Sequence, residues 1–150
     1  MRSFLNHPAR RRKIAVTAVL TMGLAALAAA YNYQWTWTGD VSRRSTQNSL
    51  VSFGRSKTMT TSSGPAYFEF VTAATANGPT SGVVVRVVNT STGAIVFDQF
   101  YQAFGGQNSY YNGYIPVGVG NYQVSFYARS SQGSTGNVNV LLGNTYLYWY

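Results

Sequence analysis

Residues 83–101 read VVVRVVNTSTGAIVFDQFY, and this stretch decides the fold class. Valines recur at alternate positions from Val83 to Val87, and β-branched residues in a period of two favour a half-buried strand. Between the two apolar runs, Asn89–Gly93 is rich in turn-forming residues. The stretch therefore predicts an antiparallel hairpin built from Val83–Asn89 and Ala94–Tyr101.

The same period of two recurs along the chain, and no window shows the apolar spacing of an amphipathic helix. Segments rich in Gly, Asn and Pro separate the alternating runs, as expected for turns. From this pattern we predict an all-β fold, a single antiparallel β-sandwich of jelly-roll or Ig-like type with about eight or nine short strands. The other alternating runs are Tyr31–Trp37, Phe68–Phe70, Tyr122–Phe126 and Val138–Leu142.

The first 30 residues differ from the rest of the chain. Met1–Lys13 is basic, Ile14–Leu27 is apolar, and Ala28-Ala29-Ala30 supplies the small residues of a leader-peptidase site. This order is typical of a secretory signal helix, although a retained N-terminal anchor is the alternative. We therefore expect residues 1–30 to be a signal peptide and residues 31–150 to form the domain, with the Ser/Thr-rich segment 38–64 partly mobile around a weak strand at Leu50–Phe53.

Charge and cysteine content narrow the classes of protein. The chain has 11 Lys and Arg against 3 Asp and Glu, but five of the positive residues lie in the leader. The remaining residues are therefore close to neutral, and we expect no nucleic-acid partner and no membrane contact beyond export. The chain has no cysteine, so disulfides, thiol catalysis and cysteine-based zinc sites are excluded.

Catalytic chemistry has few candidate residues. The only histidine, His7, lies in the leader, and the domain holds three side-chain carboxylates, Asp40, Glu69 and Asp98. A glycosidase needs two carboxylates across a cleft, and strand parity allows Glu69 and Asp98 to share one sheet face with Arg86. A solvated ladder of charges is the simpler interpretation. We expect no enzymatic activity, no metal site and no cofactor.

The most unusual feature is the content of 12 tyrosines. Between Phe104 and Tyr114 the sequence combines glycines, tyrosines, Asn and Gln, which predicts a glycine-hinged loop suited to a glycan or protein contact. The candidate ligand-binding residues are Tyr110, Tyr111, Asn112 and Tyr114. The alternative is that these tyrosines cap the ends of the sandwich and surround its core.

Four of the six positive residues of the domain lie within 15 positions, at Arg43, Arg44, Arg55 and Lys57. Such a strip could contact an anionic polymer or membrane surface. Positive charge also protects an exposed edge strand from pairing with other chains. The sequence leaves both interpretations open.

The two ends of the domain, Tyr31–Trp37 and Tyr146–Tyr150, are strongly aromatic. Each aromatic side chain buries a large apolar area, so we expect the two segments to lie in one sheet or to pack on facing sheets. The candidate strand-addition residues Tyr31, Tyr33, Trp35 and Trp37 also suggest a second function, in which this segment adds to the sheet of a neighbouring copy.

The sequence thus predicts a secreted, non-enzymatic binding module on the cell surface, in the periplasm or outside the cell, with a glycan or cell-surface protein as its partner. A self-assembling extracellular structural subunit is the first alternative. The second is a small outer-membrane β-barrel, because Gly143–Tyr148 resembles the terminal strand signal of such barrels, a glycine followed by alternating aromatic residues.

Overall fold

A computed structural model describes residues 31–45, 49–75, 81–130 and 139–150. The predicted signal peptide, residues 1–30, lies outside these ranges. Within the described residues the chain forms nine strands and no helix. The strands are β1 (Tyr33–Trp37), β2 (Val41–Arg44), β3 (Val51–Thr61), β4 (Ala66–Ala74), β5 (Ser81–Asn89), β6 (Ile95–Gln102), β7 (Ser109–Ile115), β8 (Gly120–Ser130) and β9 (Asn139–Trp149).

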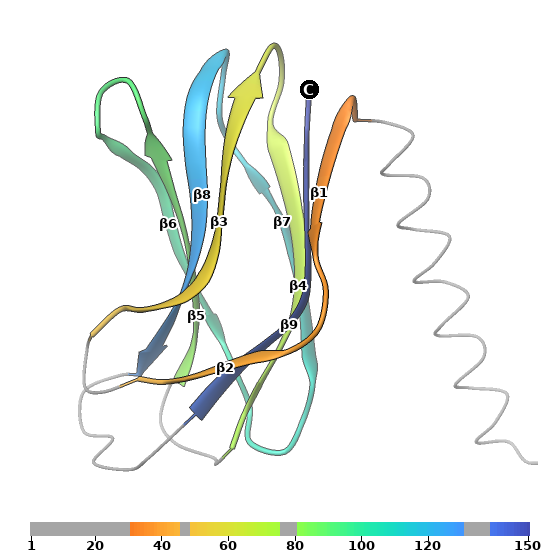
Figure 1. The fold of residues 1–150 in the computed structure, drawn as a ribbon, viewed down its shortest axis with the longest axis vertical. Coiled ribbons are helices and arrows are strands. Elements are labelled where there is room, and N and C mark those ends of the chain that lie inside the picture. The colour runs from red at the N-terminus through yellow and green to blue at the C-terminus, as the bar shows by residue number, and fades with distance from the viewer. Residues whose placement is uncertain (1–30, 46–48, 76–80, 131–138) are drawn as a thin grey trace, which may run out of the picture.

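The strands form two antiparallel sheets that pack face to face (Figure 1). Sheet A has the order β1-β9-β4-β7, with β2 also paired to β9, and sheet B has the order β3-β8-β5-β6. From β2 onward the chain crosses between the sheets after every strand except at the β5–β6 hairpin. This connectivity is that of a jelly roll rather than an Ig-like sandwich, and it confirms the predicted all-β sandwich.

Both sheets end in unpaired edge strands, so the described chain does not close on itself as a barrel. The outer-membrane barrel alternative is therefore wrong for this architecture. The aromatic alternation at Gly143–Tyr148 instead belongs to β9, a strand inside sheet A with β1 and β4 on either side.

The predicted hairpin is confirmed: β5 and β6 are paired from Gly82 opposite Gln102 to Val88 opposite Ile95. The two aromatic ends also lie in one sheet, because β1 pairs with β9 over five consecutive positions. Segment 38–64 is more regular than expected, since β3 is an 11-residue strand. Its pattern was hidden in the sequence because two of its inward positions are occupied by Arg55 and Lys57.

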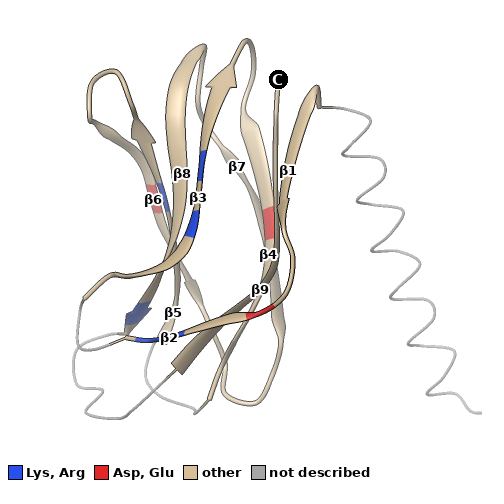
Figure 2. Cartoon of the chain, in the orientation of Figure 1, with Lys and Arg blue, Asp and Glu red and all other residues tan. Residues whose placement is uncertain are grey.

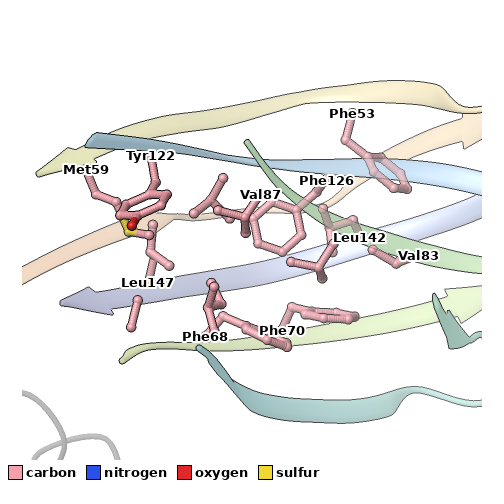
Figure 3. Packing of buried hydrophobic residues seen from close by; sticks show 14 of the residues in the cluster. Phe53, Met59, Phe68, Phe70, Val83, Val87, Tyr122, Phe126, Leu142 and Leu147 are labelled. Carbon is pink, nitrogen blue, oxygen red and sulfur yellow. The ribbon is translucent and has the colours of Figure 1, made fainter. Parts of the chain in front are cut away.

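The core lies between the two sheets, where every second residue of each strand points inward (Figure 3). Sheet A contributes Phe68, Phe70 and Leu147, and sheet B contributes Val85 and Phe126, all fully buried. Strand parity then places the intervening residues of β4, β7 and β9 on the outer face of sheet A. Among the described residues, no helix is long and apolar enough to cross a membrane.

Candidate binding site

The outer face of sheet A gathers tyrosines around one carboxylate. Its central strand β4 places Tyr67 and Glu69 on this face, opposite to the core residues Phe68 and Phe70. The pairing register sets Tyr67 between Tyr148 and Tyr114, and Glu69 between Tyr146 and Asn112. We call this surface the tyrosine face; it consists of Tyr67, Glu69, Tyr110, Asn112, Tyr114, Tyr146 and Tyr148.

Three rings of the tyrosine face, those of Tyr67, Tyr114 and Tyr148, pack together. The Tyr67 ring lies 5.1 Å from that of Tyr114 and 6.1 Å from that of Tyr148, measured between centroids. Tyr67 and Tyr148 are only 8% and 0% exposed, whereas Tyr114 is 61% exposed and Tyr110 42%. The face therefore has buried rings at its base and exposed rings at its edge strand β7.

Tyr31 covers part of this base. Its ring lies 6.5 Å from Tyr67 with nearly parallel planes, 6.0 Å from Tyr148 and 4.6 Å from Tyr150. Such distances are those of favourable aromatic contacts. The base of the tyrosine face is therefore covered in part by a ring of the chain itself.

Glu69 is the electrostatic centre of the face. It is 3% exposed, and its Oε2 atom has no hydrogen-bond partner. Burial raises the pKa of the Glu69 carboxyl, and hydrogen bonds donated by the hydroxyls of Tyr110 and Tyr67 offset only part of this effect. The hydroxyl oxygen of Tyr148 is also buried without a partner. Two unsatisfied polar atoms therefore lie beneath one surface.

The same surroundings hold the tyrosines in their neutral form. Burial, followed by the hydrogen bond and the charge of Glu69, raises the pKa of Tyr110 to about 12. Burial and the Glu69 charge also raise the pKa of Tyr148 and of Tyr67. At neutral pH these hydroxyls are therefore hydrogen-bond donors.

Three of the four residues predicted to bind a ligand lie on the tyrosine face, at Tyr110, Asn112 and Tyr114. Tyr111 points the other way, where its hydroxyl donates a 2.6 Å hydrogen bond to the Gln102 carbonyl oxygen. The second half of the expected loop is in fact strand β7, Ser109–Ile115, whereas residues 104–108 lie outside the strands. The period of two in a strand separates Tyr111 from its neighbours.

The predicted basic strip does not form one surface. Arg55 is 7% exposed and donates hydrogen bonds to the Gly143 carbonyl oxygen and to other groups of sheet A. Lys57 places its Nζ atom 3.7 Å from the centroid of the Trp35 ring, and Arg43 donates to the backbone oxygens of Ser52 and Ser42. Arg44 is exposed on β2.

The candidate strand-addition segment is paired within its own sheet. Tyr33 stacks on Trp149 at 5.7 Å between ring centroids, and Trp37 meets Phe126 edge to face at 5.8 Å. Tyr33 and Trp35 remain 55% and 42% exposed. Tyr31 precedes the strand and lies over the tyrosine face, as described above.

Strand parity allowed Glu69 and Asp98 to share a sheet face, but they do not, because β4 belongs to sheet A and β6 to sheet B (Figure 2). Asp98 instead forms an ion pair with Arg86 at 2.8 Å across the hairpin, as the ladder interpretation predicts. No group of three or more His, Cys, Asp or Glu side chains within metal-binding reach occurs in the described ranges.

Sequence reasoning missed Glu69, Tyr67, Tyr146 and Tyr148 as members of one site. Both strands that carry these residues alternate core residues with polar or phenolic ones. The polar or phenolic positions are Tyr67 and Glu69 on β4, and Tyr146 and Tyr148 on β9. That alternation was a usable signal for an outward face. The pairing of β4 with β9, which brings the two sets together, was not visible in the sequence.

Comparisons with known proteins define the fold. Neither a family model nor a curated protein sequence matches the chain. Two solved structures of infectious bursal disease virus, the Gx strain and the T13 viral particle, are similar at 13% and 12% identity with TM-scores of 0.53 and 0.52. The alignments cover 78% and 80% of this chain but only 31% and 32% of the viral chains, so it spans about a third of their length.

A second kind of similar structure is the CBM36-1 domain of a multidomain xylanase from the hindgut metagenome of Trinervitermes trinervoides. It is 14% identical, with a TM-score of 0.47, and the alignment covers 80% of this chain and 90% of that domain. The likeness to these structures concerns the fold alone.

Proposed function

We propose that this protein is a secreted, non-enzymatic module that binds a neutral glycan on the tyrosine face. The observation that carries the proposal is the pair of buried, unpartnered atoms Glu69 Oε2 and Tyr148 Oη. Buried polar groups are almost always hydrogen-bonded, and each unpaired group costs about 1–3 kcal/mol. A ligand rich in hydroxyl groups would supply both a donor for the carboxylate and an acceptor for the phenol, once the rings that cover these two atoms move aside.

The exposed rings favour a sugar over other hydroxyl-bearing ligands. Tyr114 and Tyr110 present flat apolar faces edged by hydroxyls, against which the C–H face of a pyranose ring can stack. Asn112 lies between them on the same side of β7 and offers an amide. Tyr110 links the surface to the interior, because it is exposed and also hydrogen-bonded to Glu69.

Charge supports a neutral glycan rather than an acidic one. Strands β4, β7 and β9 contain no lysine or arginine that could pair with a ligand carboxylate or sulfate. The one ionisable acid on these strands is Glu69, which repels an anion when it is charged. Residues 31–150 contain no histidine to act as a general acid or base, which supports binding without turnover.

Binding to a panel of soluble and insoluble polysaccharides, measured by calorimetry and pull-down, tests the proposal. We expect Tyr114→Ala and Tyr148→Phe each to weaken binding of any neutral glycan that is captured by about tenfold or more. Tyr127→Ala, which removes a ring from the outer side of sheet B, is the matched control and should leave binding unchanged. Equal losses in all three variants, or capture of acidic glycans alone, would reject the tyrosine face as the site.

Two further measurements address the remaining parts of the proposal. N-terminal sequencing of the protein recovered outside the cytoplasm should find a chain that begins near Tyr31, because residues 1–30 have the order of a signal peptide. Prolonged incubation with a bound glycan should release no new reducing ends. Retention in the cytoplasm would contradict export, and release of sugar would contradict the non-enzymatic role.

Self-assembly through Tyr31–Trp37 is the second candidate function. The segment is uncharged and carries the exposed Tyr33 and Trp35, which suits its donation to the sheet of a neighbouring copy. Donation of the strand would require release of its five pairs with β9. If this route operates, association of the purified protein should rise with concentration and disappear when residues 31–38 are deleted.

A further inference from the structure

The outer edge of β7 is open for pairing. β7 is the last strand of sheet A. It pairs with β4 at seven consecutive positions without a register shift, from Ser109 opposite Thr72 to Ile115 opposite Ala66. In the described part of the chain, no strand pairs with its other edge. A regular free edge is a template for another strand.

The sequence of β7 has none of the features that protect edge strands. Ser109–Ile115 contains no charged residue, no proline and no bulge. The other edges differ: β3 is interrupted near Gly54 and carries Lys57, β6 carries Asp98, and β1 has only five residues. Natural sheets use charges, bulges and short strands to prevent edge pairing, so β7 is the edge left open to it.

The sequence of β7 is also self-complementary. In an antiparallel pair centred on Asn112, each Tyr110 lies opposite the partner's Tyr114, and the two Asn112 amides meet at the axis. On the inward side Tyr111 lies opposite Gly113, which has no side chain to collide with it. Aromatic cross-strand pairs and facing amides stabilise antiparallel strands, and a two-fold axis repeats each of these contacts.

We propose that β7 pairs antiparallel with β7 of a second copy of this chain, so that two copies of sheet A form one continuous sheet. The two-fold axis is then perpendicular to the joined sheet, and both tyrosine faces lie on the same side of it. The dimer presents two neighbouring sites to a polymer, which increases avidity without new contacts to the ligand. The pairing itself does not depend on the proposed glycan function.

Sedimentation velocity over a concentration series, with protein purified after expression of the full chain and without any glycan, tests the dimer. The wild type should show a monomer–dimer equilibrium. Asn112→Lys places two ammonium groups at the axis and should weaken dimerisation by about tenfold or more, as should Asn112→Glu. Thr58→Lys, which adds the same charge to the exposed side of edge strand β3, should leave it unchanged.

A mixture of the two Asn112 variants provides the decisive test of pairing between two β7 strands. Opposite charges then meet at the axis, so the mixture should recover a heterodimer that neither variant forms alone. Circular dichroism establishes that both variants are folded. Concentration-independent sedimentation of the wild type, dimers that persist in Asn112→Lys, or folded variants that fail to recover a dimer on mixing would each overturn the proposal.

Discussion

Replacement of Arg55 by methionine tests whether one buried side chain joins the two sheets. Arg55 lies on β3 of sheet B and donates hydrogen bonds to Thr145 Oγ1 at 2.9 Å, to the Gly39 carbonyl oxygen at 2.5 Å and to the Gly143 carbonyl oxygen. All three acceptors belong to β9 or to the bend between β1 and β2. Burial lowers the pKa of Arg55, and nearby Asp40 opposes that shift.

The expected cost follows from these contacts. A hydrogen bond to a charged group contributes about 1.5–3 kcal/mol, while burial of the guanidinium offsets part of the sum. After substitution, the Gly143 carbonyl oxygen keeps the bond donated by Thr145 at 3.0 Å, so it is not left entirely unpaired. We therefore expect Arg55→Met to lower the free energy of unfolding by about 3 kcal/mol and the Tm by about 10 °C.

Urea denaturation followed by tryptophan fluorescence measures this change. Arg55→Lys should not restore stability, because an ammonium group cannot reproduce the planar fork that reaches three acceptors. Arg129→Met, which removes an exposed arginine from β8, is the control and should change stability by less than about 0.5 kcal/mol. Full stability of Arg55→Met would refute the reasoning and show that burial of the charge cancels the gain from its hydrogen bonds.

Three other substitutions have defined outcomes. Tyr148→Phe removes a buried hydroxyl without a partner and should raise the free energy of unfolding by about 1 kcal/mol in calorimetry; a loss of stability would mean that the hydroxyl is satisfied. The pKa of Glu69 is raised in the folded chain, so its contribution to stability is present below its ordinary pKa and is lost as pH rises through the folded value. Glu69→Gln should therefore flatten the dependence of the free energy of unfolding on pH, measured by urea titrations. A variant whose pH dependence runs parallel to that of the wild type would contradict this reasoning. Gly82→Ala places a Cβ atom in collision with the Tyr101 carbonyl oxygen and should cost about 3 kcal/mol or more in urea denaturation. Gly118→Ala, with open space around it, should cost far less in the same assay.

The β5–β6 hairpin illustrates what local sequence can predict. Alternation of valines and a turn-rich Asn89–Gly93 segment act over neighbouring residues, and they predict both strands and their pairing. β3 illustrates the opposite case, since Arg55 and Lys57 occupy inward positions and hide its alternation. Those side chains are tolerated there because sheet A supplies carbonyl groups and an aromatic ring to receive them.

The candidate site was predicted in part, and its missing half has a physical explanation. Parity along one strand separates Tyr110, Asn112 and Tyr114 from Tyr111 once β7 is known to be a strand. Glu69 and Tyr148 join them only through the order β9-β4-β7. These strands are distant in the chain, and no local preference encodes which of them become neighbours.

By itself, the sequence determined that the domain is a cysteine-free β-sandwich and which hairpin forms, because periodicity, turn chemistry and composition act over a few residues. The tertiary structure alone decided the jelly-roll connectivity, the position of Arg55 between the sheets and the enclosure of Glu69 by tyrosines from three strands. These features depend on pairing between distant segments, whose free energy comes from burial and hydrogen bonding in the assembled sheets.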